Sequence, residues 1–242
     1  MTLYLADASA VEYWRRADPS AKTRARAATP FGQDRETPPF SASDLAALEE
    51  AGVGWLSEPI HLLVPDASSR RRCKRTKLHV CSHRLPERSF VKLSRHVMVA
   101  SPELTCLSIA PSTPFPLLVE FLYELCGRYR LPDGRGGDAT ELPPATTVAG
   151  IARFADKARG VRGAADVKRA LRYACDNSLS PMETDIAETM VFDPRMGGFG
   201  LEKPQLNPRF EVTRKNRRAL PQSAYLPDLF WPRANILSLI HI

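Results

Sequence analysis

The sequence has no apolar run of about 18 residues or more, the length that a membrane-spanning helix needs. Residues 1–7 contain neither a basic segment nor a continuous apolar segment, so we expect no secretory signal peptide. Phosphate-binding loops, dinucleotide-binding glycine fingerprints, nucleophile elbows and kinase signatures are also missing. We therefore exclude the enzyme classes built on these motifs and expect a cytoplasmic protein without a membrane segment.

Cysteine is sparse, with five residues at irregular positions. An odd count without regular spacing predicts free thiols in a reducing compartment rather than a disulfide framework. His79, Cys81 and His83 alternate, with Cys73 nearby, and all four are residue types that bind zinc. Side chains on one strand face point the same way, which suits a tetrahedral site poorly, and no Cys-x-x-Cys pair is present. We therefore favour a structural or surface role for these residues over a zinc site.

Acidic residues are outnumbered, because 34 Lys and Arg stand against 27 Asp and Glu and give a formal net charge of +7. An excess of positive charge favours anionic partners such as nucleic acid. The positive charge is concentrated in two runs of basic residues. Residues 70–77 contain six of them, and residues 214–218 form the second run. A solvated surface loop is the alternative for both runs. The candidate DNA-contacting residues are Arg70, Arg71, Arg72, Lys74, Arg75, Lys77, Arg214, Lys215, Arg217 and Arg218.

Hydrophobic periodicity predicts a chain of mixed helices and strands. Ser101-Pro102 and Ser180-Pro181 are helix start signals, with serine as the N-cap and proline at the first helical position. A further helix is predicted at residues 7–16, and another is predicted to begin at Ser43. Residues 17–41, between them, are predicted to form a loop. Predicted strands cover residues 61–65, 77–83, 89–93, 96–100, 205–212, 225–231 and 235–240.

Glu183 and Asp228 are the candidate catalytic and metal-binding pair. Glu183 stands one turn into the helix that begins at Ser180, and Asp228 stands among apolar neighbours in the strand-like run 225–231. Aspartate is disfavoured in strands, and an acid held among apolar residues usually has a partner such as a metal or a base. Two acids on adjacent elements can hold Mg²⁺, which would activate water at a phosphodiester.

Each of the two acids could also have a purely structural role. Ser180-x-x-Glu183 fits a capping box, in which the glutamate accepts a hydrogen bond from the Ser180 backbone N–H. Asp228 fits an edge strand with its side chain in water. Spacing alone favours capping for Glu183 and leaves the two interpretations of Asp228 even.

Four motifs near the C-terminus carry a family resemblance. They are SLSPMET (178–184), GGFGL (197–201), PxLN (204–207) and YxxDLFWP (225–232). This set resembles the small nuclease-like domains related to very-short-patch repair endonucleases, within the restriction-endonuclease-like superfamily. The upstream motifs HLLVP (61–65), FV (90–91), VxVxSPEL (97–104) and ExxxELCG (120–127) are similar to AbiEi-type, antitoxin-related sequences.

The resemblance implies that Glu183 and Asp228 hold Mg²⁺ for a nuclease reaction. It also implies another acid on the next strand, near the position of Leu239, where residues 235–240 contain none. We therefore expect an incomplete metal site with little or no nuclease activity. The sequence ends in an apolar run without a capping residue. We therefore hypothesise that residues 237–242 do not belong to the natural reading frame.

The fold class we expect is α+β, with a mixed β-rich and helical N-terminal region, then helices, and a partial restriction-endonuclease-like α/β core. The expected segments are a helical and loop region at 1–55, an AbiEi-like region at 56–131, a linker at 132–145, and helices with a truncated nuclease-like domain at 146–242.

We predict a DNA-processing protein resembling a metal-dependent endonuclease. The alternatives are a non-catalytic DNA-binding regulator of antitoxin type and a protein-interaction domain. Besides DNA, the expected partners are a toxin or a second copy of the chain.

Overall fold

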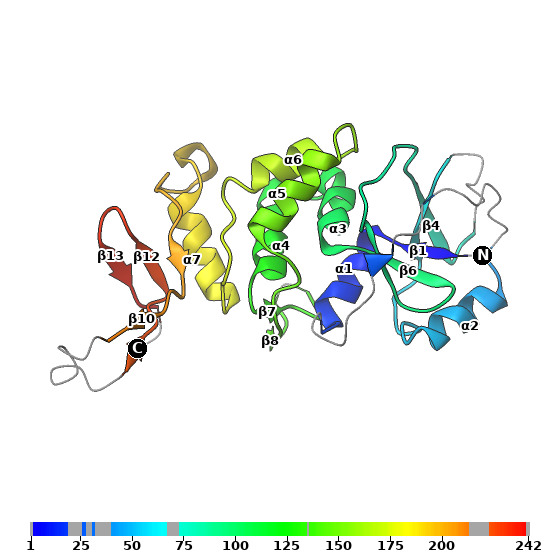
Figure 1. Ribbon diagram of the computed structural model, residues 1–242, viewed down its shortest axis with the longest axis horizontal. Coiled ribbons are helices and arrows are strands. Elements are labelled where there is room, and N and C mark those ends of the chain that lie inside the picture. The colour runs from blue at the N-terminus through cyan, green and yellow to red at the C-terminus, as the bar shows by residue number, and fades with distance from the viewer. Residues whose placement is uncertain are drawn as a thin grey trace.

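The computed structural model describes residues 2–18, 26–27, 31, 40–66, 73–134, 136–212 and 223–240. Along its longest axis the molecule has three parts in chain order (Figure 1): a sheet with two helices, a central group of helices, and a small unit of one helix and short strands. This mixture confirms the α+β class. Within the described residues, no helix has the length and apolar character that a bilayer crossing requires.

A six-stranded sheet in the order β2-β5-β6-β1-β3-β4 forms the N-terminal part. β1 is parallel to β6 and antiparallel to β3, and β3 runs parallel to β4. Helix α1 follows β1 directly and contacts β3. The bounds are β1 (Leu3–Leu5), α1 (Asp7–Arg16), β2 (Arg26–Ala27), α2 (Ala42–Glu50), β3 (Ile60–Val64), β4 (Thr76–Val80), β5 (Phe90–Lys92) and β6 (Val97–Ala100).

Strand β3 lies in the interior of this sheet and contacts α1. All five of its residues, IHLLV, are buried, as expected of a strand covered on both faces. Its neighbour β4 lies at the sheet edge, and each of its residues is partly or fully exposed. A histidine on β3 is therefore held inside the protein, whereas a histidine on β4 keeps some contact with solvent.

The central helices pack around α4. Leu118, Leu122 and Leu125 of α4 are almost completely buried and recur at the spacing of one helix face. Ser101 caps α3, since its side chain accepts a hydrogen bond from the Leu104 N–H at 3.2 Å. The bounds are α3 (Pro102–Ile109), η1 (Ala110–Ser112), α4 (Phe115–Cys126), β7 (Tyr129–Arg130), β8 (Thr140–Glu141), α5 (Val148–Lys157) and α6 (Ala164–Ala170).

Arg130 closes the C-terminal end of α4 from inside the protein. Its side chain is fully buried, and Nη1 donates hydrogen bonds to the carbonyl oxygens of Glu124, Gly127 and Tyr129. Nη2 donates to the carbonyl oxygen of Pro143 at 3.0 Å. Burial lowers the pKa of the Arg130 guanidinium. One side chain thus satisfies carbonyl groups that the end of a helix leaves without intrahelical partners.

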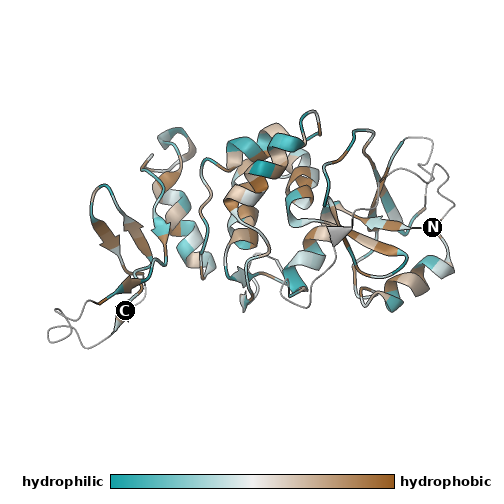
Figure 2. Ribbon diagram, in the orientation of Figure 1, coloured by the Kyte–Doolittle hydropathy of each residue, from teal (hydrophilic) through white to brown (hydrophobic). Residues whose placement is uncertain are grey.

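The C-terminal unit joins α7 to a three-stranded antiparallel sheet in the order β13-β12-β9. Leu206, Leu229 and Trp231 of this sheet belong to the same buried apolar cluster as Ala187 and Val191 of α7. Strands β12 and β13 are apolar along most of their length (Figure 2). The bounds are α7 (Pro181–Val191), η2 (Pro194–Met196), β9 (Gln205–Leu206), β10 (Phe210–Glu211), β11 (Ala224–Tyr225), β12 (Leu229–Trp231) and β13 (Ile236–Ser238).

Several predicted elements are wrong in extent. The runs 205–212 and 225–231 are not single strands, because β9 and β12 belong to one sheet while β10 and β11 form another. The strand expected at 77–83 ends at Val80, and the helix expected from Ser43 begins at Ala42 with Ser41 as its N-cap. β1 was not predicted, and β2 lies within the expected loop at 17–41.

Candidate functional site

Glu183 is held at the start of α7 by local sequence. Ser180 is the N-cap, and its Oγ accepts a hydrogen bond from the Glu183 N–H at 3.2 Å, while Pro181 occupies the first turn. The Glu183 side chain is buried, and its Oε2 accepts from the Leu179 N–H at 2.9 Å. The expected capping role is therefore present in a modified form, because the carboxylate reaches the N–H of Leu179 rather than that of Ser180.

Asn207 connects the two candidate acids. Its Nδ2 donates to Glu183 Oε2 at 2.7 Å, and its backbone N–H donates to the Asp228 carbonyl oxygen at 3.0 Å. Asn207 has a φ of 49°, in the left-handed region that asparagine tolerates better than most residues. This turn follows β9 directly and directs the amide toward the start of α7.

Asp228 lies immediately before β12, not inside a strand as predicted. Because β12 is antiparallel to both β9 and β13, continuing each register by one residue sets Asn207 and Leu239 on either side of Asp228. The Asp228 Oδ2 accepts a hydrogen bond from the Ile240 N–H. We call Asn207, Asp228 and Leu239 the cross-strand row. Its third position is apolar and exposed.

The basic residues are only partly described. Arg70, Arg71, Arg72, Arg214, Lys215, Arg217 and Arg218 lie outside the described residues. Lys74 and Lys77 are exposed, whereas Arg75 donates hydrogen bonds to Glu58 and forms an ion pair with it. β4, which contains Lys77, lies at the opposite end of the molecule from β12 (Figure 1). Lys74, Arg75 and Lys77 are therefore remote from the acid pair.

His79, Cys81 and His83 do not form a shared site. β4 ends at Val80, so Cys81 and His83 leave the strand, and the Cys81 Sγ donates to the His83 carbonyl oxygen at 3.8 Å. Burial raises the pKa of the Cys81 thiol, which disfavours the thiolate that zinc requires. His79 instead turns toward Asp7 and His61.

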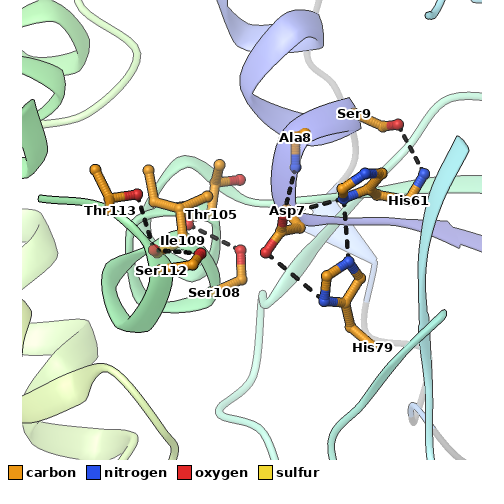
Figure 3. Close-up of polar contacts among 10 residues, drawn as sticks. All are labelled: Asp7, Ala8, Ser9, His61, His79, Thr105, Ser108, Ile109, Ser112 and Thr113. Carbon is orange, nitrogen blue, oxygen red and sulfur yellow. Dashed lines mark hydrogen bonds and ion pairs between the residues drawn. The ribbon is translucent and has the colours of Figure 1, made fainter. Parts of the chain in front are cut away.

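Asp7, His61 and His79 form the one group of three metal-ligating side chains found in the described part of the chain (Figure 3). His61 Nδ1 lies 3.0 Å from Asp7 Oδ1 and 3.0 Å from His79 Nε2, and His79 Nδ1 lies 3.7 Å from Asp7 Oδ2. These residues come from the β1–α1 junction, β3 and β4, which are neighbours in the sheet. Neither Asp7 nor His61 was predicted to be a site residue.

The electrostatics of this group favour a charged Asp7. Burial by itself would raise the pKa of the Asp7 carboxyl. The hydrogen bond from His61, the charge of His79 and the Ala8 N–H outweigh burial, so the pKa lies below its ordinary value. Asp7 is therefore a carboxylate across the physiological pH range.

Glu183→Ala is expected to lower the free energy of unfolding by about 2 kcal/mol, because it removes the buried acceptor of the Leu179 N–H and of the Asn207 amide. Urea denaturation followed by circular dichroism measures this change. The matched control is Glu202→Ala, which removes an exposed glutamate paired with Arg233 at 3.5 Å and should change stability by less than about 1 kcal/mol. Equal effects of the two substitutions would contradict the capping role.

No protein-family model matches the chain, and neither curated proteins nor solved structures provide a match.

Proposed function

We propose that this chain is a DNA-processing protein whose C-terminal unit is a nuclease-like module with an incomplete metal site. The observation that carries the proposal is the Asn207 bridge, which contacts the side chain of Glu183 and the main chain of Asp228. Asn207 thus joins the start of α7, which carries Glu183, to the start of β12, where Asp228 lies.

The order of elements supports a restriction-endonuclease-like core for this unit. Helix α7 precedes three antiparallel strands, β9, β12 and β13, and β12 lies in the middle of the sheet. Glu183 is on the helix, and Asp228 begins the middle strand. This is the arrangement that the resemblance to very-short-patch repair endonucleases implies.

The donor set fits Mg²⁺ in part. Mg²⁺ prefers oxygen ligands and commonly uses one or two carboxylates, which Glu183 and Asp228 would supply. A bound Mg²⁺ would supply Lewis-acid stabilisation of a phosphodiester and an activated water. Leu239 occupies the third position of the cross-strand row and has no ligand atom, so we expect no cleavage by this chain.

Exposed positive charge supports DNA as the partner. The chain carries a net charge of +7, and Lys74, just before β4, and Lys77, within β4, are exposed. Each lysine or arginine that contacts a phosphate releases counterions from the duplex and makes binding depend on salt. The basic runs at 70–77 and 214–218 are the proposed contacts.

A non-catalytic DNA-binding regulator of antitoxin type is the second candidate. It is favoured by the use of both carboxylates in intramolecular hydrogen bonds, from Leu179 and Asn207 to Glu183 and from Ile240 to Asp228. Exposed apolar side chains in the same unit, such as Leu226, Ile236 and Phe199, would fit a toxin or a second copy of the chain.

Binding to a duplex of about 25 base pairs at several salt concentrations tests the proposal, with a slope of about −0.9 in log K against log salt for each phosphate contacted. The double variant Lys74→Ala/Lys77→Ala is expected to reduce the slope by about two contacts. Lys92→Ala/Lys157→Ala removes the same charge from exposed positions elsewhere and should leave the slope unchanged. A flat salt dependence of the unsubstituted chain would overturn DNA binding.

A plasmid-nicking assay with Mg²⁺ separates the two candidates from an active enzyme. We expect cleavage at background level for the unsubstituted chain. Robust nicking that is lost in Asp228→Ala would show a complete active site and refute the incomplete metal site.

A further inference from the structure

We propose that Asp7, His61 and His79 bind a divalent transition metal ion of the Zn²⁺ class. The group belongs to the N-terminal sheet and is independent of the acid pair in the C-terminal unit. It shares no residue with the proposed Mg²⁺ site, so either site can exist without the other.

The hydrogen-bonding capacity of His61 is the first argument. Each ring nitrogen of histidine has one in-plane position, which holds either a proton or a lone pair. The Nδ1 of His61 lies 3.0 Å from Asp7 Oδ1 and 3.0 Å from His79 Nε2. A proton at Nδ1 must be shared between the carboxylate and a lone pair on His79 Nε2, whereas a lone pair at Nδ1 faces the carboxylate. A cation among the three side chains satisfies all of them at once.

The distances are the second argument. Zn²⁺ binds histidine nitrogen and carboxylate oxygen at about 2.0–2.2 Å, so two ligand atoms of its tetrahedron lie about 3.4 Å apart. His61 Nδ1 lies 3.0 Å from both Asp7 Oδ1 and His79 Nε2, somewhat less than that separation. The other ring nitrogen of His79, Nδ1, lies 3.7 Å from Asp7 Oδ2, somewhat more than that separation. One ligand atom from each residue lies within 4.8 Å of the others. The three side chains therefore need only a small adjustment to surround the ion.

The backbone that presents the ligands is firmly anchored. Asp7 has a φ of 50°, an uncommon conformation that the surrounding structure must hold, and its Oδ1 also accepts from the Ala8 N–H at 3.0 Å. The His61 N–H donates to Ser9 Oγ at 2.9 Å, and the Ala6 N–H donates to the His61 carbonyl oxygen. These bonds fix the β1–α1 junction against β3, as a preformed metal site requires.

The ligand set and its surroundings specify the class of ion. Imidazole nitrogens with one carboxylate suit Zn²⁺ and its neighbours in the transition series rather than Mg²⁺ or Ca²⁺. Three protein ligands leave a position for water or another small ligand, as in zinc sites that are not purely structural. Asp7 lines a cavity of about 900 Å³, which also borders Ser112 and Thr113 and gives a small molecule access to the carboxylate side of the group.

Isothermal titration of the metal-free full chain with Zn²⁺ tests this site, and Co²⁺ provides a second probe because tetrahedral Co²⁺ has a distinctive visible absorption. We expect one Zn²⁺ per chain, a Zn²⁺-dependent rise in the melting temperature, and a tetrahedral Co²⁺ spectrum. Asp7→Asn, which keeps the size of the side chain, and His79→Asn, on the partly exposed edge strand, should each weaken binding by about ten-fold or more.

His83→Ala is the matched control, because it removes an exposed histidine close to β4 that lies outside the group. It should leave the Zn²⁺ affinity and the Co²⁺ spectrum unchanged. Absence of Zn²⁺ binding to the folded chain would overturn the proposal. Binding that survives in both Asp7→Asn and His79→Asn, or that is lost in His83→Ala, would place the ion elsewhere and would overturn it as well.

Discussion

Leu239→Glu is expected to raise the affinity of the chain for Mg²⁺ by roughly 10- to 100-fold, because it adds a carboxylate ligand beside Asp228. Continuing the β12–β13 register by one residue sets position 239 across from Asp228, and directly opposed residues of antiparallel strands have Cβ atoms about 4.5–5.5 Å apart. Leu239 is 57% exposed, so the substitution disturbs little packing. Calorimetric titration with Mg²⁺ measures the change.

Leu237→Glu is the matched control for this substitution. Leu237 has the same exposed fraction, 57%, and pairs with Phe230, two residues away from Asp228. The substitution adds the same charge two residues earlier in the chain but no ligand to the cross-strand row, so its effect on Mg²⁺ affinity should be small. Equal gains in the two variants would mean that net charge, and not a specific site, attracts the ion.

Arg130→Ala is expected to lower the free energy of unfolding by about 3–5 kcal/mol, because a large buried side chain and the hydrogen-bond donors of four carbonyl oxygens disappear together. The loss should appear as cooperative unfolding at lower urea concentration. It should weaken both the end of α4 and the β7–β8 connection, because Arg130 joins them.

Arg128→Ala provides the comparison two residues earlier. Arg128 is exposed and pairs with Glu141 at 3.5 Å, an interaction worth less than about 1 kcal/mol. If Arg130→Ala were no more destabilising than Arg128→Ala, the buried guanidinium would not support the end of α4.

Helices were the most predictable part of the fold because their signals are local. Ser101-Pro102 and Ser180-Pro181 place a side-chain acceptor and a residue without N–H where a helix begins, and α3 and α7 start there. The helix expected at residues 7–16 has those bounds in α1. Each signal depends on residues within one turn and needs no knowledge of distant partners.

Short strands were less predictable because pairing partners decide where they end. The run 205–212 divides after Leu206, where Asn207 adopts a positive φ and Pro208 lacks an N–H for pairing. Pro227 stands in the corresponding gap between β11 and β12. Both prolines could be seen in the sequence. Which of the two sheets the residues before and after each proline join depends on contacts with residues that are distant in the sequence.

Of the candidate sites, the helix-capping position of Glu183 could be predicted from the sequence, whereas the group of Asp7, His61 and His79 could not. Asp7 and His61 are 54 residues apart, and His61 and His79 are 18 apart, so no short motif contains them. His79 was noticed only through its alternation with Cys81 and His83, and β4 ends before both. The pairing of β1 with β3 and of β3 with β4 brings the group together.

The most direct test of a shared cation site between helix and sheet uses Mn²⁺ as a paramagnetic substitute for Mg²⁺ in the ¹⁵N-labelled Leu239→Glu chain. The side-chain amide of Asn207 and the backbone N–H of Ile240 are hydrogen-bonded to Glu183 and Asp228, so their signals should broaden at the lowest Mn²⁺ concentrations. Adding Asp228→Asn should restore both signals. If they stay sharp while signals elsewhere in the C-terminal unit broaden first, Glu183 and Asp228 do not share a cation.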